Sequence, residues 1–179
     1  MKKILSAMAF VIFAGIFNFC SANIVHMEMV RISDYNVHDF YTNFNRIARD
    51  VMTNNVFMNK YPEKIDGWSD NNYDVYVTAC SLENEKGSPV VILYANKEGY
   101  VSYLKIVGVY GLVMNGTMTN LFTTIGLTFD EMKNLFHLLK NNDNVVTHSD
   151  SINRNIIVYI RDAKGVQAKE IEIIALKEK

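Results

Sequence analysis

The sequence predicts an α+β fold: a two-layer sandwich with helices packed on one face of a mostly antiparallel sheet of about five to six strands. Segments in which apolar and polar residues alternate with period two are typical of strands, and short turns join them, as in antiparallel neighbours. The segments with helical periodicity are grouped together instead of separating single strands, which favours α+β over α/β. The expected order of elements is β-α-β-β-β-α-α-β-β.

The chain begins with a stretch, residues 1–22, that has the layout of a secretory signal peptide. Lys2 and Lys3 form a positive start, and Ile4–Phe19 is almost wholly apolar. Small residues then lead to the expected cleavage point after Ala22. The alternative is an uncleaved membrane anchor. We therefore expect an exported protein, located in the periplasm or outside the cell.

The rest of the chain, residues 23–179, has the length of one domain. A lipoprotein attached through Cys20 is disfavoured, because the bulky Phe19 stands where a small residue is wanted. Once the leader is removed, Cys80 is the remaining cysteine, so an intramolecular disulfide is not expected. The net charge of the full chain is −1 at pH 7, which gives no basic field for nucleic acid.

The first strand is expected within Ile24–Ile32, and the clearest helix is expected over Asn36–Thr53. Asn36 is placed to cap this helix, and Arg46 and Asp50 have the four-residue spacing of a surface ion pair. The apolar residues keep the spacing of one buried stripe: Val37, Phe40, Tyr41, Phe44, Ile47, Ala48 and Val51.

The segment Asn54–Tyr73 has no clear periodicity and is predicted to be a long loop. It carries Tyr61, Trp68 and Tyr73 among polar residues, and Trp68 is the sole tryptophan of the chain. Tyrosine and tryptophan combine a large flat surface with a polar group, which suits recognition. These three residues are our candidate ligand- or partner-binding residues. In the alternative, the loop is a lid whose aromatic side chains cover the core.

Strands are next expected in Asp74–Leu82 and in two hairpins, one over Pro89–Val107 and one over 155–176. Each hairpin has a turn of the pattern (Asn/Asp)-x-(Glu/Lys)-Gly, and Gly99 ends the first turn. Glycine there suits the left-handed position of a bulged hairpin. We interpret the shared pattern either as an old duplication or as hairpin chemistry alone.

Residues Ile106–Phe129 carry no Asp, Glu, Lys or Arg, and we expect them to lead from a strand into a buried pair of helices. The many Thr, Asn and Gly residues of this stretch argue against a membrane span. Gly126 is placed to end the first helix, and Thr128-Phe129-Asp130-Glu131 matches a capping box. The next buried stripe includes Phe136, and Asn141–Ser151 is expected to be a polar loop.

No spacing of Ser, Cys, His or Asp in the sequence indicates catalytic residues, and no motif predicts a cofactor or a metal site. The sequence therefore favours an exported binding module for a protein partner or an envelope component, a class to which an inhibitor or immunity protein would belong. The alternative is a small cell-envelope hydrolase whose active site is assembled only in space. In that case His137 or His148 is expected in a polar cleft together with carboxylates.

Overall fold

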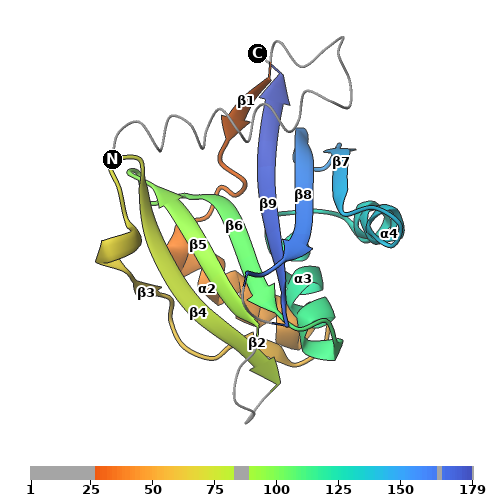
Figure 1. The fold of residues 1–179 in the computed structure, drawn as a ribbon, viewed down its shortest axis with the longest axis horizontal. Helices are drawn as coiled ribbons and strands as arrows, with labels where there is room; N and C mark the ends of the chain where they lie inside the picture. Colours follow the sequence, from red (N-terminus) through yellow and green to blue (C-terminus); the bar gives the residue numbers. More distant parts are fainter. Residues whose placement is uncertain (1–26, 83–88, 165–166, 179) are drawn as a thin grey trace.

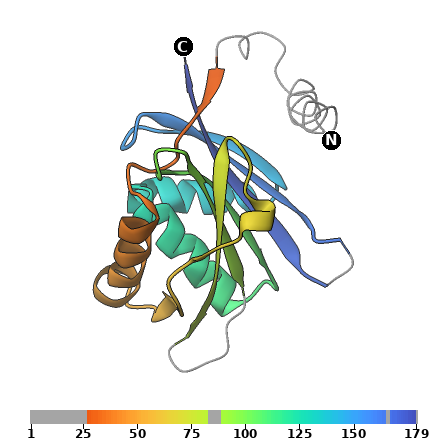
Figure 2. The same ribbon diagram turned by 90° about the vertical axis from the view of Figure 1, so that its left-hand side faces the viewer.

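The computed structural model describes residues 27–82, 89–164 and 167–178 of the chain. In this part of the chain, nine strands form one antiparallel sheet, and the helices lie on one side of it (Figures 1 and 2). The predicted α+β class is therefore confirmed, but the sheet is larger than the expected five to six strands. The predicted leader, residues 1–22, and Gly165 of the second hairpin turn lie outside the described residues.

The elements of the described chain have the following bounds. The strands are β1 (Met27–Val30), β2 (Val56–Met58), β3 (Glu63–Lys64), β4 (Tyr73–Leu82), β5 (Val90–Asn96), β6 (Val101–Gly108), β7 (Asn144–Ser149), β8 (Arg154–Asp162) and β9 (Lys169–Glu178). The helices are α2 (Val37–Arg46), α3 (Leu112–Thr124) and α4 (Phe129–Leu139). A π-helical turn, η2 (Ile47–Val51), continues α2, and η3 (Asp66–Trp68) is a short 3₁₀ turn.

Two three-stranded meanders make up most of the sheet. The strand order is β2-β4-β5-β6-β9-β8-β7, with β1 paired to β9 and β3 paired to β4. The meanders β4-β5-β6 and β7-β8-β9 thus meet at β6 and β9 in mirrored order (Figure 1). The duplication hypothesis accordingly extends from two hairpins to two units of three strands. In the first hairpin, Gly99 has the expected left-handed conformation, with φ of 89°, and the register shifts between Tyr94 and Ala95.

The core lies between the helices and the face of the sheet that they cover. Phe44 of α2 and Phe122 of α3 are fully buried, as are Leu93, Leu104 and Ile173 of the sheet. These strand residues alternate with outward-facing ones, as period-two strands require. The predicted capping of α2 is confirmed, because the backbone N–H of Asp39 donates a 2.9 Å hydrogen bond to the side chain of Asn36.

Three strands were missing from the sequence-based order. The predicted loop Asn54–Tyr73 contains β2 and β3, and the predicted polar loop Asn141–Ser151 contains β7. The strands β2 and β3 have three and two residues, which is too short for a period-two pattern to show. In β7, Asn, Thr, His and Ser surround the apolar pair Val145-Val146, so its composition is that of a loop.

The charge-free stretch forms the end of β6, all of α3 and the turn into α4. The helix α3 begins at Leu112, directly after Gly111. Among the described residues, no helix is both long and apolar enough to cross a membrane. Gly126, with φ of 102°, follows the end of α3, and the capping box of Thr128 and Glu131 at the start of α4 is confirmed.

Candidate functional site

The three aromatic residues expected to form a binding surface do not come together. Tyr61 lies against α2, with its ring centroid 5.6 Å from that of Tyr41. Tyr73 packs edge-on against Tyr103 at 5.3 Å. On β6, Tyr103 alternates with the buried Leu104, so Tyr73 lies on the sheet face that the helices leave open.

Trp68 lies on the 3₁₀ turn η3, which packs beside β4. It is 61% exposed, so the alternative in which it covers the core is wrong for this residue. Tyr61 is also exposed, at 49%. The role of these residues in binding stays a prediction.

The histidines expected in an enzyme active site lie on the surface. In β7, Nε2 of His148 is 3.4 Å from a carboxylate oxygen of Asp150, and Nδ1 is 3.1 Å from the amide oxygen of Asn155. The hydroxyls of Ser149 and Ser151 are directed instead to the carboxylate of Glu131. Among the described residues, neither Ser149 nor Ser151 is therefore positioned as a nucleophile beside His148 and Asp150.

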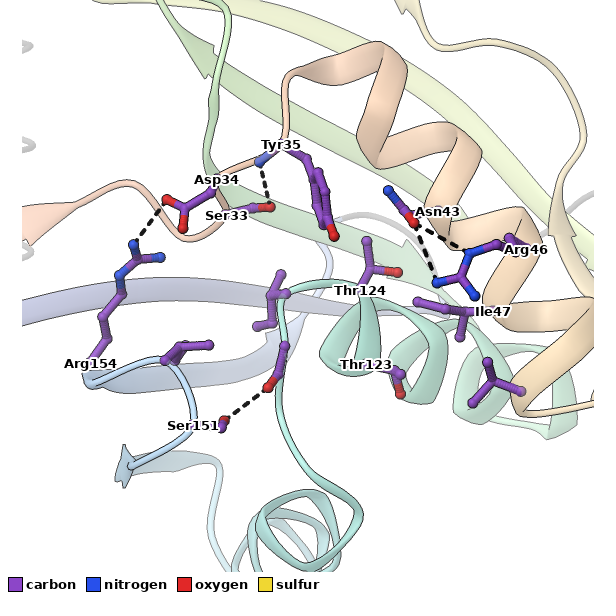
Figure 3. Close-up of a pocket in the computed structure, with 14 residues that line it drawn as sticks. Ser33, Asp34, Tyr35, Asn43, Arg46, Ile47, Thr123, Thr124, Ser151 and Arg154 are labelled. Carbon is purple, nitrogen blue, oxygen red and sulfur yellow. Dashed lines mark hydrogen bonds and ion pairs between the residues drawn. The ribbon is translucent and has the colours of Figure 1, made fainter.

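A cleft lies between α2, the end of α3 and the turn from β7 to β8 (Figure 3). Its volume is about 530 Å³, within the range of small-molecule sites. Its lining comes from four segments that are distant in sequence: Ser33, Asp34, Tyr35, Asn43, Arg46, Ile47, Val51, Thr123, Thr124, Ile125, Gly126, Ser151, Ile152 and Arg154. None of Tyr61, Trp68 and Tyr73 belongs to this lining.

The π-helical turn η2 shapes the α2 wall of the cleft. The backbone N–H of Met52 donates a 2.8 Å bond to the carbonyl of Ile47, five residues back. Ile47 and Val51, the first and last residues of this turn, both line the cleft. Helices of this kind are rare and occur frequently at functional sites.

The same turn separates Arg46 from its expected partner. The predicted ion pair of Arg46 with Asp50 needs the four-residue repeat of an α-helix, and η2 interrupts that repeat. Arg46 contacts the amide oxygen of Asn43 instead, at 3.4 Å from both Nε and a terminal nitrogen. Within the described part of the chain, no carboxylate forms an ion pair with Arg46. The guanidinium thus brings an uncompensated positive charge to the cleft (Figure 3).

At the other end of the cleft, the charges are already paired. The carboxylate of Asp34 accepts hydrogen bonds from Arg154 at 3.2 Å and from Arg31 at 2.9 Å. Figure 3 shows Asp34 and Arg154 directed toward each other and away from Arg46. The hydroxyl ends of Tyr35 and Thr124 point into the space between these two ends.

Glu131 holds the wall formed by the β7–β8 turn. Its carboxylate accepts hydrogen bonds from the hydroxyl of Ser149 at 2.8 Å and from the backbone N–H of Thr128 at 2.7 Å. The hydroxyl of Ser151 lies 2.7 Å from Glu131 and 2.8 Å from the carbonyl of Gly126. Burial acts to raise the pKa of Glu131, but these donors outweigh it and hold the pKa at about 2. The wall is therefore fixed by a carboxylate that stays ionised.

Sequence reasoning missed this site because its residues follow no local pattern. The one local signal is the Arg46–Asp50 spacing, and it indicates a surface ion pair rather than a cleft. Comparison of the chain with protein-family models, with curated proteins and with solved structures gave no match.

Proposed function

We propose that this protein is an exported binding module that holds a small ligand in the cleft between α2, α3 and the β7–β8 turn. The observation that carries the proposal is the π-helical turn η2, whose Ile47 and Val51 form one wall. A turn of this kind departs from the regular helical hydrogen-bond pattern, and such departures are frequent at functional sites.

The cleft has the composition of a ligand site. Its exposed apolar surface is supplied mainly by Val51 and the half-buried Ile152, and its polar groups converge from Tyr35 and Arg46. Apolar walls with a few directed polar groups are the usual build of small-molecule pockets, because the walls give affinity and the polar groups fix orientation.

A hydrolase in the cell envelope is the second candidate, and the pair of His148 and Asp150 is the observation that favours it. Catalysis by a histidine base needs a nucleophile or a water within hydrogen-bond reach. The serine hydroxyls nearest in sequence are bonded to Glu131, and the pair lies on the exposed edge of β7. We therefore prefer binding.

A cleft-filling substitution tests the proposed site. The purified protein is screened by thermal shift against a library of small organic compounds, and hits are repeated on Val51→Trp. Val51 lines the cleft and is 51% exposed, so a larger side chain can occupy the space without entering the core. Val146→Trp is the matched control, because Val146 is 61% exposed on β7 and is not part of the cleft lining.

Compounds that stabilise the wild type and the control, but not Val51→Trp, would support binding in the cleft. Hits that stabilise all three proteins equally would place binding elsewhere, and a complete lack of hits would contradict a small-molecule function.

A further inference from the structure

We infer that the ligand of the cleft is an amphipathic anion, with a carboxylate or phosphate group at Arg46 and an apolar body along Val51 and Ile152. This inference rests on the proposed function and names the chemical class that the cleft selects. It follows from the charges at the two ends of the cleft and from the nature of the wall between them.

The guanidinium of Arg46 has donors that are available to an anion. Its only described polar contact is the neutral amide of Asn43, at the long distance of 3.4 Å. A guanidinium presents its N–H groups in a planar fork that matches a carboxylate or a phosphate with two parallel hydrogen bonds. Asn43 leaves most of these donors available, so an anion gains new bonds here without displacing an ion pair.

No other charge in the cleft competes for this anion or repels it strongly. Arg154 is paired with Asp34, whose carboxylate is shared with Arg31. The negative charge of Asp34 is compensated by these two arginines. Figure 3 shows it at the end of the cleft opposite to Arg46. The anionic group is therefore expected at the α2 end, and a cationic ligand would meet Arg46 unfavourably.

The body of the ligand is expected to lie against the apolar part of the cleft wall. The apolar residues of the lining that keep exposed surface are Val51, at 51%, and the half-buried Ile152, whereas Ile47 and Ile125 are buried. Burying apolar surface against such walls is favourable in proportion to its area, at roughly 25 cal/mol per Å². The hydroxyl of Tyr35 adds a polar group to the cleft, whereas Thr124 is buried and donates a 2.6 Å bond to the carbonyl of Asn120. We therefore expect an unbranched alkyl chain as the body of the ligand.

Four probes with the same eight-carbon chain and different head groups test the inference: octanoate, octyl phosphate, 1-octanol and octylamine. Their affinities are measured by calorimetric titration of the purified wild-type protein, below the concentrations at which the probes aggregate. Octanoate, octyl phosphate or both are expected to bind at least about tenfold more tightly than octanol, because hydrogen bonds to charged groups are the stronger ones. Octylamine is expected to bind most weakly, and added salt should weaken the anions selectively.

The variants then assign the effect to one side chain. Arg46→Gln should weaken the anionic probes by about tenfold and leave octanol unchanged, whereas Arg46→Lys should fall between because it keeps the charge but loses the fork. Arg49→Gln is the matched control: Arg49 is an exposed arginine of the adjoining turn η2, outside the cleft lining, and its loss should change nothing.

The outcomes separate this inference from the proposed function. If octanol or octylamine binds as tightly as the anions, or if Arg46→Gln has no effect, the anionic class is wrong. If binding is then still abolished by Val51→Trp, the cleft remains the binding site. If no probe binds, or if Val51→Trp leaves all binding intact, the proposed cleft function fails as well.

Discussion

The carboxylate of Glu131, in the first turn of α4, lies 2.7 Å from the hydroxyl of Ser151 in the wall of the cleft. The same carboxylate closes the capping box with Thr128. One ionised side chain therefore both starts a helix and positions the β7–β8 turn. Replacing it should affect the fold and the cleft together.

Glu131→Gln should lower the free energy of unfolding at pH 7 by about 1–2 kcal/mol, the cost of weakening hydrogen bonds to a charged group. Because the folded-state pKa of Glu131 is depressed to about 2, its contribution is complete above its ordinary pKa of 4.5 and is lost as pH falls toward 2. Urea unfolding of wild type and variant from pH 7 to pH 2 should show the gap closing over that interval.

The control for this experiment is Glu98→Gln, because Glu98 is exposed on the β5–β6 turn. It should change stability by less than about 0.5 kcal/mol. A gap between wild type and Glu131→Gln that stays constant from pH 7 to pH 2 would show that the ionised carboxylate has no special role.

The two helical phenylalanines predicted as core residues should differ in cost. Phe44 is fully buried, whereas Phe136 is only partly buried and packs edge-on against Phe122 at 5.7 Å. Phe44→Ala should cost roughly 3–5 kcal/mol, and Phe136→Ala should cost less, roughly 1–3 kcal/mol. The midpoints of urea unfolding, at unchanged slope, measure both losses of stability. A larger loss for Phe136→Ala than for Phe44→Ala would contradict the burial of α2.

Trp68 gives an optical test of the exposed turn η3. With 61% of its surface exposed, its fluorescence should be red-shifted and readily quenched by acrylamide in the folded protein. Trp68→Ala should change the free energy of unfolding by less than about 0.5 kcal/mol, as expected away from the core. A blue-shifted emission that resists quenching, or a loss of several kcal/mol, would mean that the side chain is buried.

Export makes a separate prediction about the start of the chain. The positive start, the apolar run and the small residues up to Ala22 predict removal of the leader. N-terminal sequencing of the exported protein should therefore begin near Asn23. Recovery of intact Met1 in a membrane fraction would instead support an uncleaved anchor.

Local sequence patterns were sufficient to predict the elements that depend on neighbouring residues or on a strong periodicity. The stripe of α2, the Gly99 turn and the capping box at Thr128 are all visible in the sequence because cap, turn and periodicity are set by neighbouring residues. The strands β2 and β3 were missed because two or three residues show no period.

The cleft depends on relationships that no local pattern contains. Tyr35, Arg46, Thr124 and Ile152 belong to four separate segments that meet only in the folded chain. The turn η2 was missed because the apolar residues of Asn36–Thr53 fit an uninterrupted α-helix, and the extra residue of a π-helical turn leaves no signature in composition. That unpredicted turn also separates Arg46 from Asp50.

Chemical-shift mapping of the ¹⁵N-labelled protein with octanoate tests whether a small anion binds in the cleft at Arg46. Shifts are expected at the side-chain Nε–H of Arg46 and at backbone amides of the three other segments that line the cleft: Ser33–Tyr35, Thr123–Gly126 and Ser151–Arg154. Shifts centred on η3 and Trp68, or no shifts at all, would contradict it.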